Sequence, residues 1–324
     1  MTSYRQAGVD LLGADRHVAN ISSVVTSTWA ANVIGGFGGF AAGVEIPDGY
    51  QRPVLMMSVD GVGTKLELAR LAGRWDGIGM DVVAMCVDDV AALGARPIGF
   101  VDYLAVGALD LERDLAIVTS IAAACRMAGC PLLGGETAEH PGVMEAHAVD
   151  LAGAVMGVVE HGAELGASRV VEGDKLVGLK SPNLRSNGFS LIRALFADSL
   201  EEHLESFLEP SVIYSPAVQN AVATGAVHSA AHITGGGIAG NIPRSLPRHL
   251  GASIDTKAWK PPAVFEAVAA KGVNRDEMWR TFNMGIGFCL TVDPDGLGAV
   301  LAATAEHDPT VIGVVTAGGG LDIR

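Results

Sequence analysis

Residues 58–67 read Ser-Val-Asp-Gly-Val-Gly-Thr-Lys-Leu-Glu and follow the apolar run Val-Leu-Met-Met at 54–57. The run predicts a strand, and the loop after it contains Asp60, two glycines and Lys65. Glycines let a backbone approach an anion closely, a lysine supplies positive charge, and an aspartate can bind a metal ion. This is not a Walker A loop, because the first glycine of that motif is missing and Leu66 follows the lysine. The stretch therefore predicts a phosphate and metal site in another fold; the alternative is a glycine turn with a solvated lysine.

The overall composition is that of a globular protein. The chain has 324 residues, 49% hydrophobic and 18% charged, which is enough for a large core in two domains or one large α/β domain. A net charge of −14 and the lack of Lys/Arg-rich runs argue against nucleic-acid binding. No apolar stretch is long enough to span a membrane, and the N-terminal residues lack a signal peptide. The four cysteines show no CxxC spacing, so we expect reduced, buried thiols and a cytoplasmic protein.

Strand-like and helix-like runs alternate along the chain, which is typical of the α/β class. In the run 111–128, apolar residues recur every three or four positions, with Asp110 as N-cap and Gly129 as a stop. A polar segment at 161–168 separates two halves, so we expect domains at 1–167 and 168–324. The expected strands are 54–59, 98–106, 149–160, 175–180 and 282–292, and the expected helices are 81–93, 111–128, 188–196, 213–224, 263–271 and 296–307.

Three aspartates interrupt an otherwise apolar helix at 81–93. At about 100° per residue, Asp81 and Asp88 lie about 20° apart around the helix, and Asp89 lies about 80° from Asp81. Carboxylates on a buried helix face are costly unless they are paired or bind a cation. With Asp60 nearby, Mg²⁺ is the cation we expect; the alternative is an exposed acidic edge.

Glycine-rich segments mark four further candidate loops. Residues 35–41 read Gly-Gly-Phe-Gly-Gly-Phe-Ala, which fits a flexible flap better than a dinucleotide fingerprint, because no clean strand precedes it and no helix follows. In Gly-Gly-Glu-Thr at 134–137, Glu136 either binds a ligand at a strand end or caps a helix. Residues 184–190 and 234–237 place small polar groups and backbone amides before helices, where anions bind. Asn283 lies in an apolar strand, where its amide must find partners or a ligand.

Taken together, these segments resemble the aminoimidazole ribonucleotide synthetase family, also called phosphoribosylformylglycinamidine cyclo-ligases. The resemblance runs nearly from end to end. Its matching segments are 4–10, 35–40, 60–66, 81–89, 102–103, 134–139, 186–191, 231–237, 241–244 and 281–287.

The resemblance implies a ligase of purine biosynthesis. Such an enzyme closes the ring of formylglycinamidine ribonucleotide with ATP, giving aminoimidazole ribonucleotide, ADP and phosphate. It implies an α/β (α+β) two-domain fold whose N-terminal mixed sheets pair in a homodimer barrel, and Mg²⁺ as a cofactor. It further implies a phosphorylated small-molecule substrate.

The same resemblance implies roles for individual residues. The catalytic residues would be Lys65, Asp60, Ser186 and Asn187, and the metal ligands would be Asp60, Asp81 and Asp89. Nucleotide or substrate would be bound by Gly35, Gly36, Gly38, Gly39, Gly61, Gly63, Thr64, Glu136, Gly235, Gly236, Gly237 and Asn283.

Three residues depart from the family pattern. Arg185 stands where the family usually has His, Asp88 where it usually has Asn, and Val59 where it usually has Thr. The alternatives are other members of the superfamily and a non-catalytic nucleotide-binding protein. Selenophosphate synthetase should carry a reactive Cys near its start, a hydrogenase maturation factor should end in Cys, and thiamine-phosphate kinase lacks the combination of motifs at 234–237 and 281–285.

Overall fold

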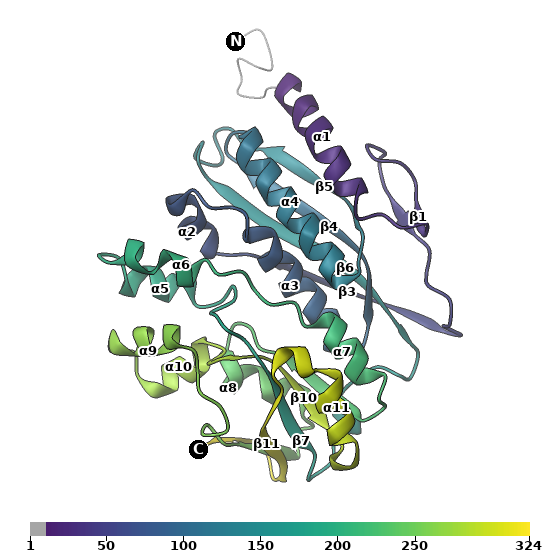
Figure 1. Ribbon diagram of the computed structural model, residues 1–324, viewed down its shortest axis with the longest axis vertical. Helices are drawn as coiled ribbons and strands as arrows, with labels where there is room; N and C mark the ends of the chain where they lie inside the picture. The colour runs from purple at the N-terminus through teal and green to yellow at the C-terminus, as the bar shows by residue number, and fades with distance from the viewer. Residues whose placement is uncertain (1–10) are drawn as a thin grey trace.

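The computed structural model describes residues 11–324, so the resemblance at 4–10 lies outside the described part of the chain. The chain forms two halves, each with its own sheet, and the helix α3 (Ile78–Ala91) lies against both (Figure 1). One hydrophobic cluster continues through both halves, from Val62 and Ile78 to Phe189 and Ile312. The two halves therefore pack on each other through a shared apolar core.

The N-terminal half is built on a four-stranded sheet in the order β3-β6-β4-β5. Its strands are β3 (Pro53–Gly61), β6 (Val149–Glu160), β4 (Arg96–Val106) and β5 (Leu132–Glu139). β6 pairs antiparallel with both β3 and β4, and β5 pairs parallel with β4. The sheet is therefore mixed, as the resemblance implies.

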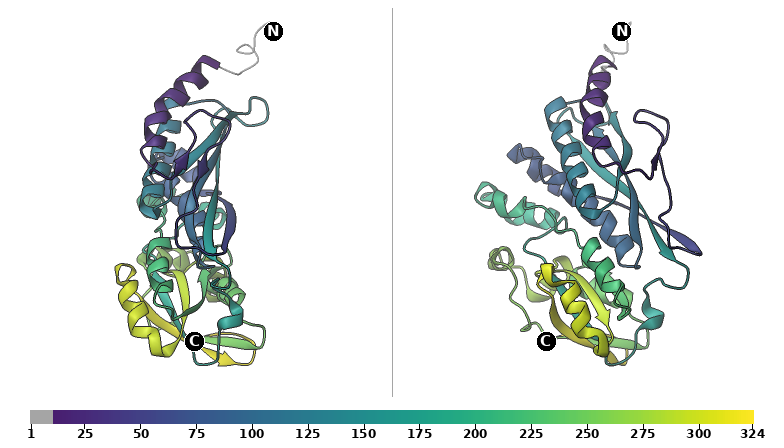
Figure 2. Two further views of the ribbon diagram at one scale, coloured as in Figure 1. Left: turned by 90° about the vertical axis from the view of Figure 1, so that its right-hand side faces the viewer. Right: turned by 45° about the vertical axis from the view of Figure 1, so that its right-hand side comes forward.

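Helices cover one face of this sheet. Besides α3, these are α1 (Leu11–Thr26) and α4 (Leu111–Ala128), with α2 (Lys65–Ala72) directly after β3 (Figure 2). The Asp110 side chain accepts hydrogen bonds from the backbone amides of Glu112 and Arg113, and Gly129 ends α4 in the left-handed conformation, which confirms both predicted ends of this helix. α3 approaches α4 so closely at Gly79 that a Cβ there would lie 2.1 Å from a backbone nitrogen of α4.

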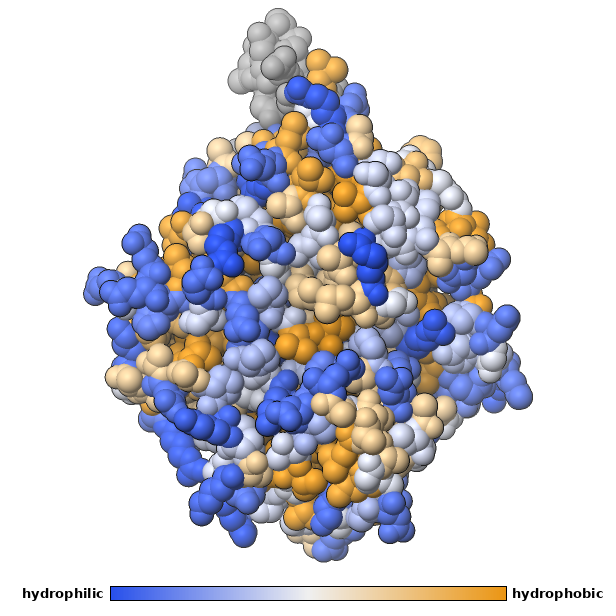
Figure 3. Space-filling view, viewed as in Figure 1, coloured by the Kyte–Doolittle hydropathy of each residue, from blue (hydrophilic) through white to orange (hydrophobic). Residues whose placement is uncertain are grey.

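The opposite face of the four-stranded sheet has no helix over it among residues 11–324 (Figure 2, left). Large apolar or aromatic side chains are exposed there at alternating positions of the two strands β3 and β4: Leu55, Met57, Val59, Val101 and Tyr103. On the helix-bearing face, by contrast, hydrophobic residues form separate small patches among hydrophilic ones (Figure 3). The bare sheet face thus carries a row of exposed apolar side chains on each of these two strands.

The C-terminal half contains a six-stranded sheet in the order β12-β9-β11-β7-β10-β8, antiparallel except for the pair β12–β9. Its strands are β7 (Lys175–Lys180), β8 (Val227–His232), β9 (Leu250–Ile254), β10 (Ile286–Val292), β11 (Thr310–Ala317) and β12 (Gly320–Ile323). Its helices are α5 (Phe189–Leu195), α6 (Leu204–Phe207), α7 (Ser215–Val222), α8 (Gly237–Asn241), α9 (Ala263–Ala270), α10 (Arg275–Thr281) and α11 (Leu297–Ala303). The short 3-10 helices are Ala167–Arg169, Leu200–His203, Ile242–Ser245, Pro294–Gly296 and Ala305–His307.

The structure agrees with most expected elements and corrects some. The expected elements do not include the helices α1, α2, α6 and α10 or the strands β8, β9, β11 and β12. The strand expected at 282–292 begins only at Ile286, because Met284 (φ 51°) and Gly285 (φ 88°) form a turn. No helix within residues 11–324 is long and apolar enough to cross a bilayer.

Candidate active site

The carboxylates of α3 are partnered with side chains and backbone from both halves of the chain. Nζ of Lys65 lies 2.8 Å from Asp81, and neither side chain has exposed surface. The same ammonium donates to the carbonyl oxygens of Glu209 (2.8 Å) and Arg185 (3.2 Å), and Asp81 also accepts from the hydroxyl of Ser211 (2.6 Å). Burial lowers the pKa of Lys65, and the adjacent Asp81 opposes that shift. Lys65 thus joins the halves in the interior.

Asp88 is neutralised in a second buried ion pair. One of its oxygens lies 3.0 Å from a terminal nitrogen of Arg185, and both side chains are fully buried. The other oxygen accepts from the backbone amides of Tyr214 (2.8 Å) and Ser215 (2.9 Å). Two of the three departures from the family pattern, Arg185 and Asp88, are therefore partners of each other.

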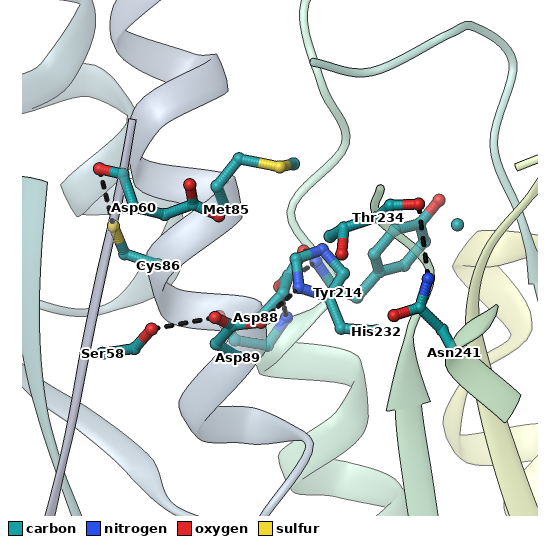
Figure 4. Close-up of polar contacts among 12 residues, drawn as sticks. Ser58, Asp60, Met85, Cys86, Asp88, Asp89, Tyr214, His232, Thr234 and Asn241 are labelled. Atoms are coloured by element: carbon teal, nitrogen blue, oxygen red, sulfur yellow. Dashed lines mark hydrogen bonds and ion pairs between the residues drawn. The ribbon is translucent and has the colours of Figure 1, made fainter. Parts of the chain in front are cut away.

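Asp89 is the α3 carboxylate that remains accessible, with a side chain 40% exposed. It accepts from the hydroxyl of Ser58 on β3 (2.8 Å) and contacts Nδ1 of His232 on β8 (2.9 Å), as Figure 4 shows. Burial alone would raise the pKa of Asp89, but the hydrogen bonds from His232 and Ser58, with the positive charge of Arg244, leave it below its ordinary value. Asp89 is therefore a charged carboxylate held from both halves.

A cavity of about 300 Å³ lies at this junction. Ser58 and Asp89 line it from the N-terminal half, and His232, Asn241 and Arg244 line it from the C-terminal half. Asp60, at the end of β3, is close enough that the negative charge of Asp89 adds to the effect of burial in raising its pKa. Asp89 and Arg244 thus line an interdomain cavity, and Asp60 lies near enough to feel the charge of Asp89.

The structure does not bring the three expected metal ligands together. Eight residues along α3 separate Asp81 from Asp89, which is about 12 Å along a helix axis. Across residues 11–324, no three His, Cys, Asp or Glu side chains are arranged to hold one ion. In this structure Lys65 neutralises Asp81 and Arg185 neutralises Asp88, whereas we expected Mg²⁺ to neutralise this helix face. Asp60 and Asp89 remain as a neighbouring pair.

The expected phosphate contact of Lys65 also differs from the structure. Its ammonium has no exposed surface and is enclosed by Asp81 and two carbonyl groups, so it does not face the loop at 60–64. Gly61 ends β3, and Gly63 and Thr64 precede α2, where they line a separate cavity of about 340 Å³ with Arg70 and Arg193. The backbone of this loop, and not the lysine, is what the structure presents to a ligand.

The predicted loops of the C-terminal half lie side by side. The amide of Asn187 contacts the sulfur of Met85 on α3 (3.9 Å), and a Cβ on Gly235 would lie 3.5 Å from the Asn187 carbonyl oxygen. Within the described chain, the buried hydroxyl oxygen of Ser186 has no hydrogen-bond partner. Gly236 and Gly237 begin α8, and Gly237 must be glycine because its φ is +58° and a Cβ would clash with the carbonyl oxygen of Trp279. Asn187 thus contacts α3 directly, and Gly235 lies next to Asn187.

The first glycine loop lines a cavity of about 660 Å³. Gly35, Gly36, Gly38 and Gly39 belong to the connection between the antiparallel strands β1 (Val33–Ile34) and β2 (Gly43–Val44), so the dinucleotide fingerprint is excluded. Gly36–Ala42 line the cavity together with Glu136, Asp102 and His17. Glu136 lies within the edge strand β5, which corrects the alternative that it caps a helix.

Asn283 has a structural role in this conformation. Its amide donates to the carbonyl oxygen of Asn183 (2.9 Å) and its carbonyl accepts from the backbone of Gly285 (2.7 Å). It therefore fastens the turn before β10 to the loop before α5, and is not placed to bind a ligand. The sequence motifs assign no role to Ser58 or His17; for Ser58 the available signal is a hydroxyl directly after the apolar run at 54–57.

Comparisons with known proteins agree with this architecture. The N-terminal domain of the family described as AIR synthase related protein matches residues 38–159, and its C-terminal domain matches residues 171–324. The two-domain fold and its interdomain site thus define the class: an AIR synthase related enzyme.

The relatives narrow the class to one family. The phosphoribosylformylglycinamidine cyclo-ligase of Synechococcus elongatus is 45% identical over 304 residues, covering 90% of this chain and 89% of the relative. That of Desulfotalea psychrophila is 42% identical over 308 residues, covering 91% and 86%. The chain belongs to the phosphoribosylformylglycinamidine cyclo-ligase family and is an enzyme of the ligase class.

Solved structures share the fold at low identity. Hydrogenase maturation protein HypE in complex with ATP aligns with a TM-score of 0.70 at 19% identity, covering 96% of this chain and 89% of that one. Thiamine-monophosphate kinase from Stenotrophomonas maltophilia K279a aligns with a TM-score of 0.67 at 20% identity, covering 98% and 97%. Both kinds of protein are among the alternatives considered above, and their likeness to this chain concerns the fold alone.

Proposed function

We propose that this chain closes the imidazole ring of aminoimidazole ribonucleotide from formylglycinamidine ribonucleotide, using ATP and releasing ADP and phosphate. The observation that carries the proposal is the 45% identity to a cyclo-ligase over 90% of the chain. The formyl oxygen attacks the γ-phosphate of ATP and ADP leaves, which gives an imidoyl phosphate. A substrate nitrogen then attacks the activated carbon, and phosphate leaves with that oxygen.

This chemistry needs positioning and charge more than covalent help from the protein. The residues at the interdomain junction suit these needs. Asp60 and Asp89 are neighbouring carboxylates whose mutual repulsion a divalent cation would relieve, and carboxylate oxygens are what Mg²⁺ prefers. Two carboxylates leave coordination positions for water and phosphate oxygens. When bound, Mg²⁺ would neutralise phosphate charge; Asp60 and Asp89 would hold it.

The loops around the junction supply neutral donors for anions. We assign the backbone of Gly61, Gly63 and Thr64, and the Gly235–Gly237 segment with Ser186 and Asn187, to the phosphoryl and substrate groups. The hydroxyl of Ser186, buried without a partner in the described chain, is free to donate to an oxygen anion. Lys65 acts indirectly, because it holds the start of α2 against both halves.

We assign the ATP base and ribose to the 660 Å³ cavity, with Gly35, Gly36, Gly38 and Gly39 as a covering loop and Glu136 as a polar contact. HypE with ATP and T. maritima PurL with AMPPCP share the fold, which supports a nucleotide site on this architecture.

We also propose that the chain forms a homodimer through the bare face of the four-stranded sheet. Leu55, Met57 and Val59 on β3 and Val101 and Tyr103 on β4 present alternating exposed side chains on either side of β6, a pattern that a second sheet would bury. The four cysteines are buried and unbridged, which suits a reducing compartment such as the cytoplasm.

Turnover tests the function directly. The purified chain is mixed with Mg-ATP and formylglycinamidine ribonucleotide, and phosphate and aminoimidazole ribonucleotide are followed together. We expect the two products in equal amounts and ADP release that depends on the substrate. ADP release that is independent of the ribonucleotide, or that requires thiamine phosphate instead, would overturn the proposal.

A further inference from the structure

A continuous chain of hydrogen bonds leads from the backbone before α7 to the accessible carboxylate of Asp89. Backbone amides of Tyr214 and Ser215 donate to Asp88, and Asp88 pairs with Arg185. A terminal nitrogen of Arg185 lies 3.0 Å from Nε2 of His232, whose Nδ1 lies 2.9 Å from Asp89. The chain crosses three times between the two halves of the protein.

The direction of each hydrogen bond follows from the chemistry of the guanidinium group. Arginine carries only donors, so Nε2 of His232 must accept from Arg185 through its lone pair. A neutral imidazole that accepts at Nε2 carries its proton on Nδ1. Nδ1 therefore donates to Asp89, and Arg185 selects the tautomer that makes this bond.

Arg185 is itself held rigidly, so this selection does not depend on a mobile side chain. It is fully buried, its backbone lies in the left-handed region (φ 60°), and its guanidinium carbon lies 4.8 Å from the centre of the Tyr214 ring. The imidazole of His232 stacks on Phe288 at 5.9 Å with 28° between the planes. Neither group is free to rotate.

We propose that Arg185 is a positioning residue: by fixing His232 in the Nδ1–H tautomer, it orients the Asp89 carboxylate toward the interdomain cavity. Ser58 holds the second oxygen of Asp89, and each oxygen keeps a further lone pair for a ligand. The inference rests on the proposed function in that Asp89 serves the Mg²⁺-ATP site. Replacing a residue that orients a metal ligand typically lowers metal affinity or activity 10- to 100-fold.

The tautomer is measured first, on the metal-free wild-type chain with ¹⁵N-labelled histidine. The His232 signals are assigned by their loss in His232→Gln. We expect a protonated Nδ1 and an unprotonated Nε2. A dominant Nε2–H tautomer, or an imidazolium with both nitrogens protonated, would overturn the proposal, and neither result requires any Arg185 variant to fold.

The functional consequence is measured with Arg185→Lys, which keeps the charge but loses the planar, forked donor geometry. We expect mixed tautomers of His232 and a 10- to 100-fold weaker affinity for Mn²⁺, read by water-proton relaxation. Arg74→Lys is the matched control: Arg74 also pairs with a carboxylate across the halves (Glu205, 2.7 Å), but at the surface. It should change neither quantity.

A purely structural role for Arg185 predicts a different result. Arg185→Lys would then lower the urea midpoint while tautomer and Mn²⁺ affinity stayed as in wild type, and the proposal would be rejected. If the wild-type chain does not turn over formylglycinamidine ribonucleotide, the proposed function fails, whereas the tautomer and Mn²⁺ measurements still decide the role of Arg185.

Discussion

Nζ of Lys65 lies 2.8 Å from the carboxylate of Asp81, and both side chains are completely buried. The lysine that follows the glycine loop is therefore used to fasten α2 to α3 and to the C-terminal half, and not to meet a phosphate at the surface. Asp88 and Arg185 repeat the arrangement two turns further along α3. Each of these four buried charges has a partner, because a lone charge in this interior would be strongly destabilising.

Replacing Lys65 with Met should therefore unfold the protein more readily. Asp81 would lose its counter-charge while still buried, and breaking a buried pair costs about 3–5 kcal/mol. Urea denaturation measures the difference in unfolding free energy. Lys65→Met combined with Asp81→Asn should recover much of the loss. If Lys65→Met abolished turnover with unchanged urea stability, the lysine would have the phosphate role that its sequence position suggested.

The pair Asp88–Arg185 should behave as one coupled unit. Asp88→Asn and Arg185→His, each alone, leave an unmatched partner in the core, whereas the double variant restores the residue pair usual in the family by resemblance. We expect the double variant to be more stable than the sum of the single effects predicts, by about 1–3 kcal/mol in a double-mutant cycle. Additive effects would show that the two residues are not coupled.

Asp89→Asn should raise the Mg²⁺ concentration needed for half-maximal turnover at least about tenfold, because it removes one of the two neighbouring carboxylates. The matched control is Asp308→Asn, which breaks an exposed ion pair with Lys180; neither residue lines the cavity of Asp89. Asp81→Asn should affect stability and leave the Mg²⁺ requirement of the folded enzyme largely as it is. An unchanged requirement in Asp89→Asn would contradict our metal assignment.

Leu55→Glu should convert a dimer into a monomer. Leu55 is 48% exposed on the bare face of the sheet, and a charge there would oppose pairing with a second sheet. Leu71→Glu is the control, since Leu71 is 54% exposed on α2, away from that face. Sedimentation velocity distinguishes the two states. A wild-type chain that sediments as a monomer would refute the proposed interface.

The pH dependence of stability should carry a contribution from Asp102. Burial, with the nearby charge of Glu136, raises the pKa of this carboxyl from 3.8 to about 7 in the folded chain. The folded state then binds more protons than the unfolded state between these values, so stability is lost as pH rises from about 4 to about 7. Asp102→Asn should flatten this slope in urea titrations at several pH values. A slope identical to that of wild type would show that Asp102 ionises normally.

Local sequence patterns predict those helices and strands whose caps, periods and ends lie close together in the chain. The helix 111–128 was recognised because its cap, period and terminating glycine lie within twenty residues of one another. β6 and β7 were predicted with their observed ends, because their apolar runs are bounded by polar residues. Ordered motifs along most of the chain also indicated the family. These features depend on neighbours in sequence, so the sequence alone determined them.

The partners of the charged residues were decided only by the tertiary structure. Nothing near Asp81, Asp88 or Asp89 in sequence distinguishes a carboxylate that meets lysine from one that meets arginine or histidine. Their partners Arg185 and His232 are about a hundred residues or more away and reach α3 only when the two halves pack together. An unpaired buried charge is strongly destabilising. The packing of the two halves therefore pairs Asp81 and Asp88 with cations in the interior and leaves Asp89 at the cavity.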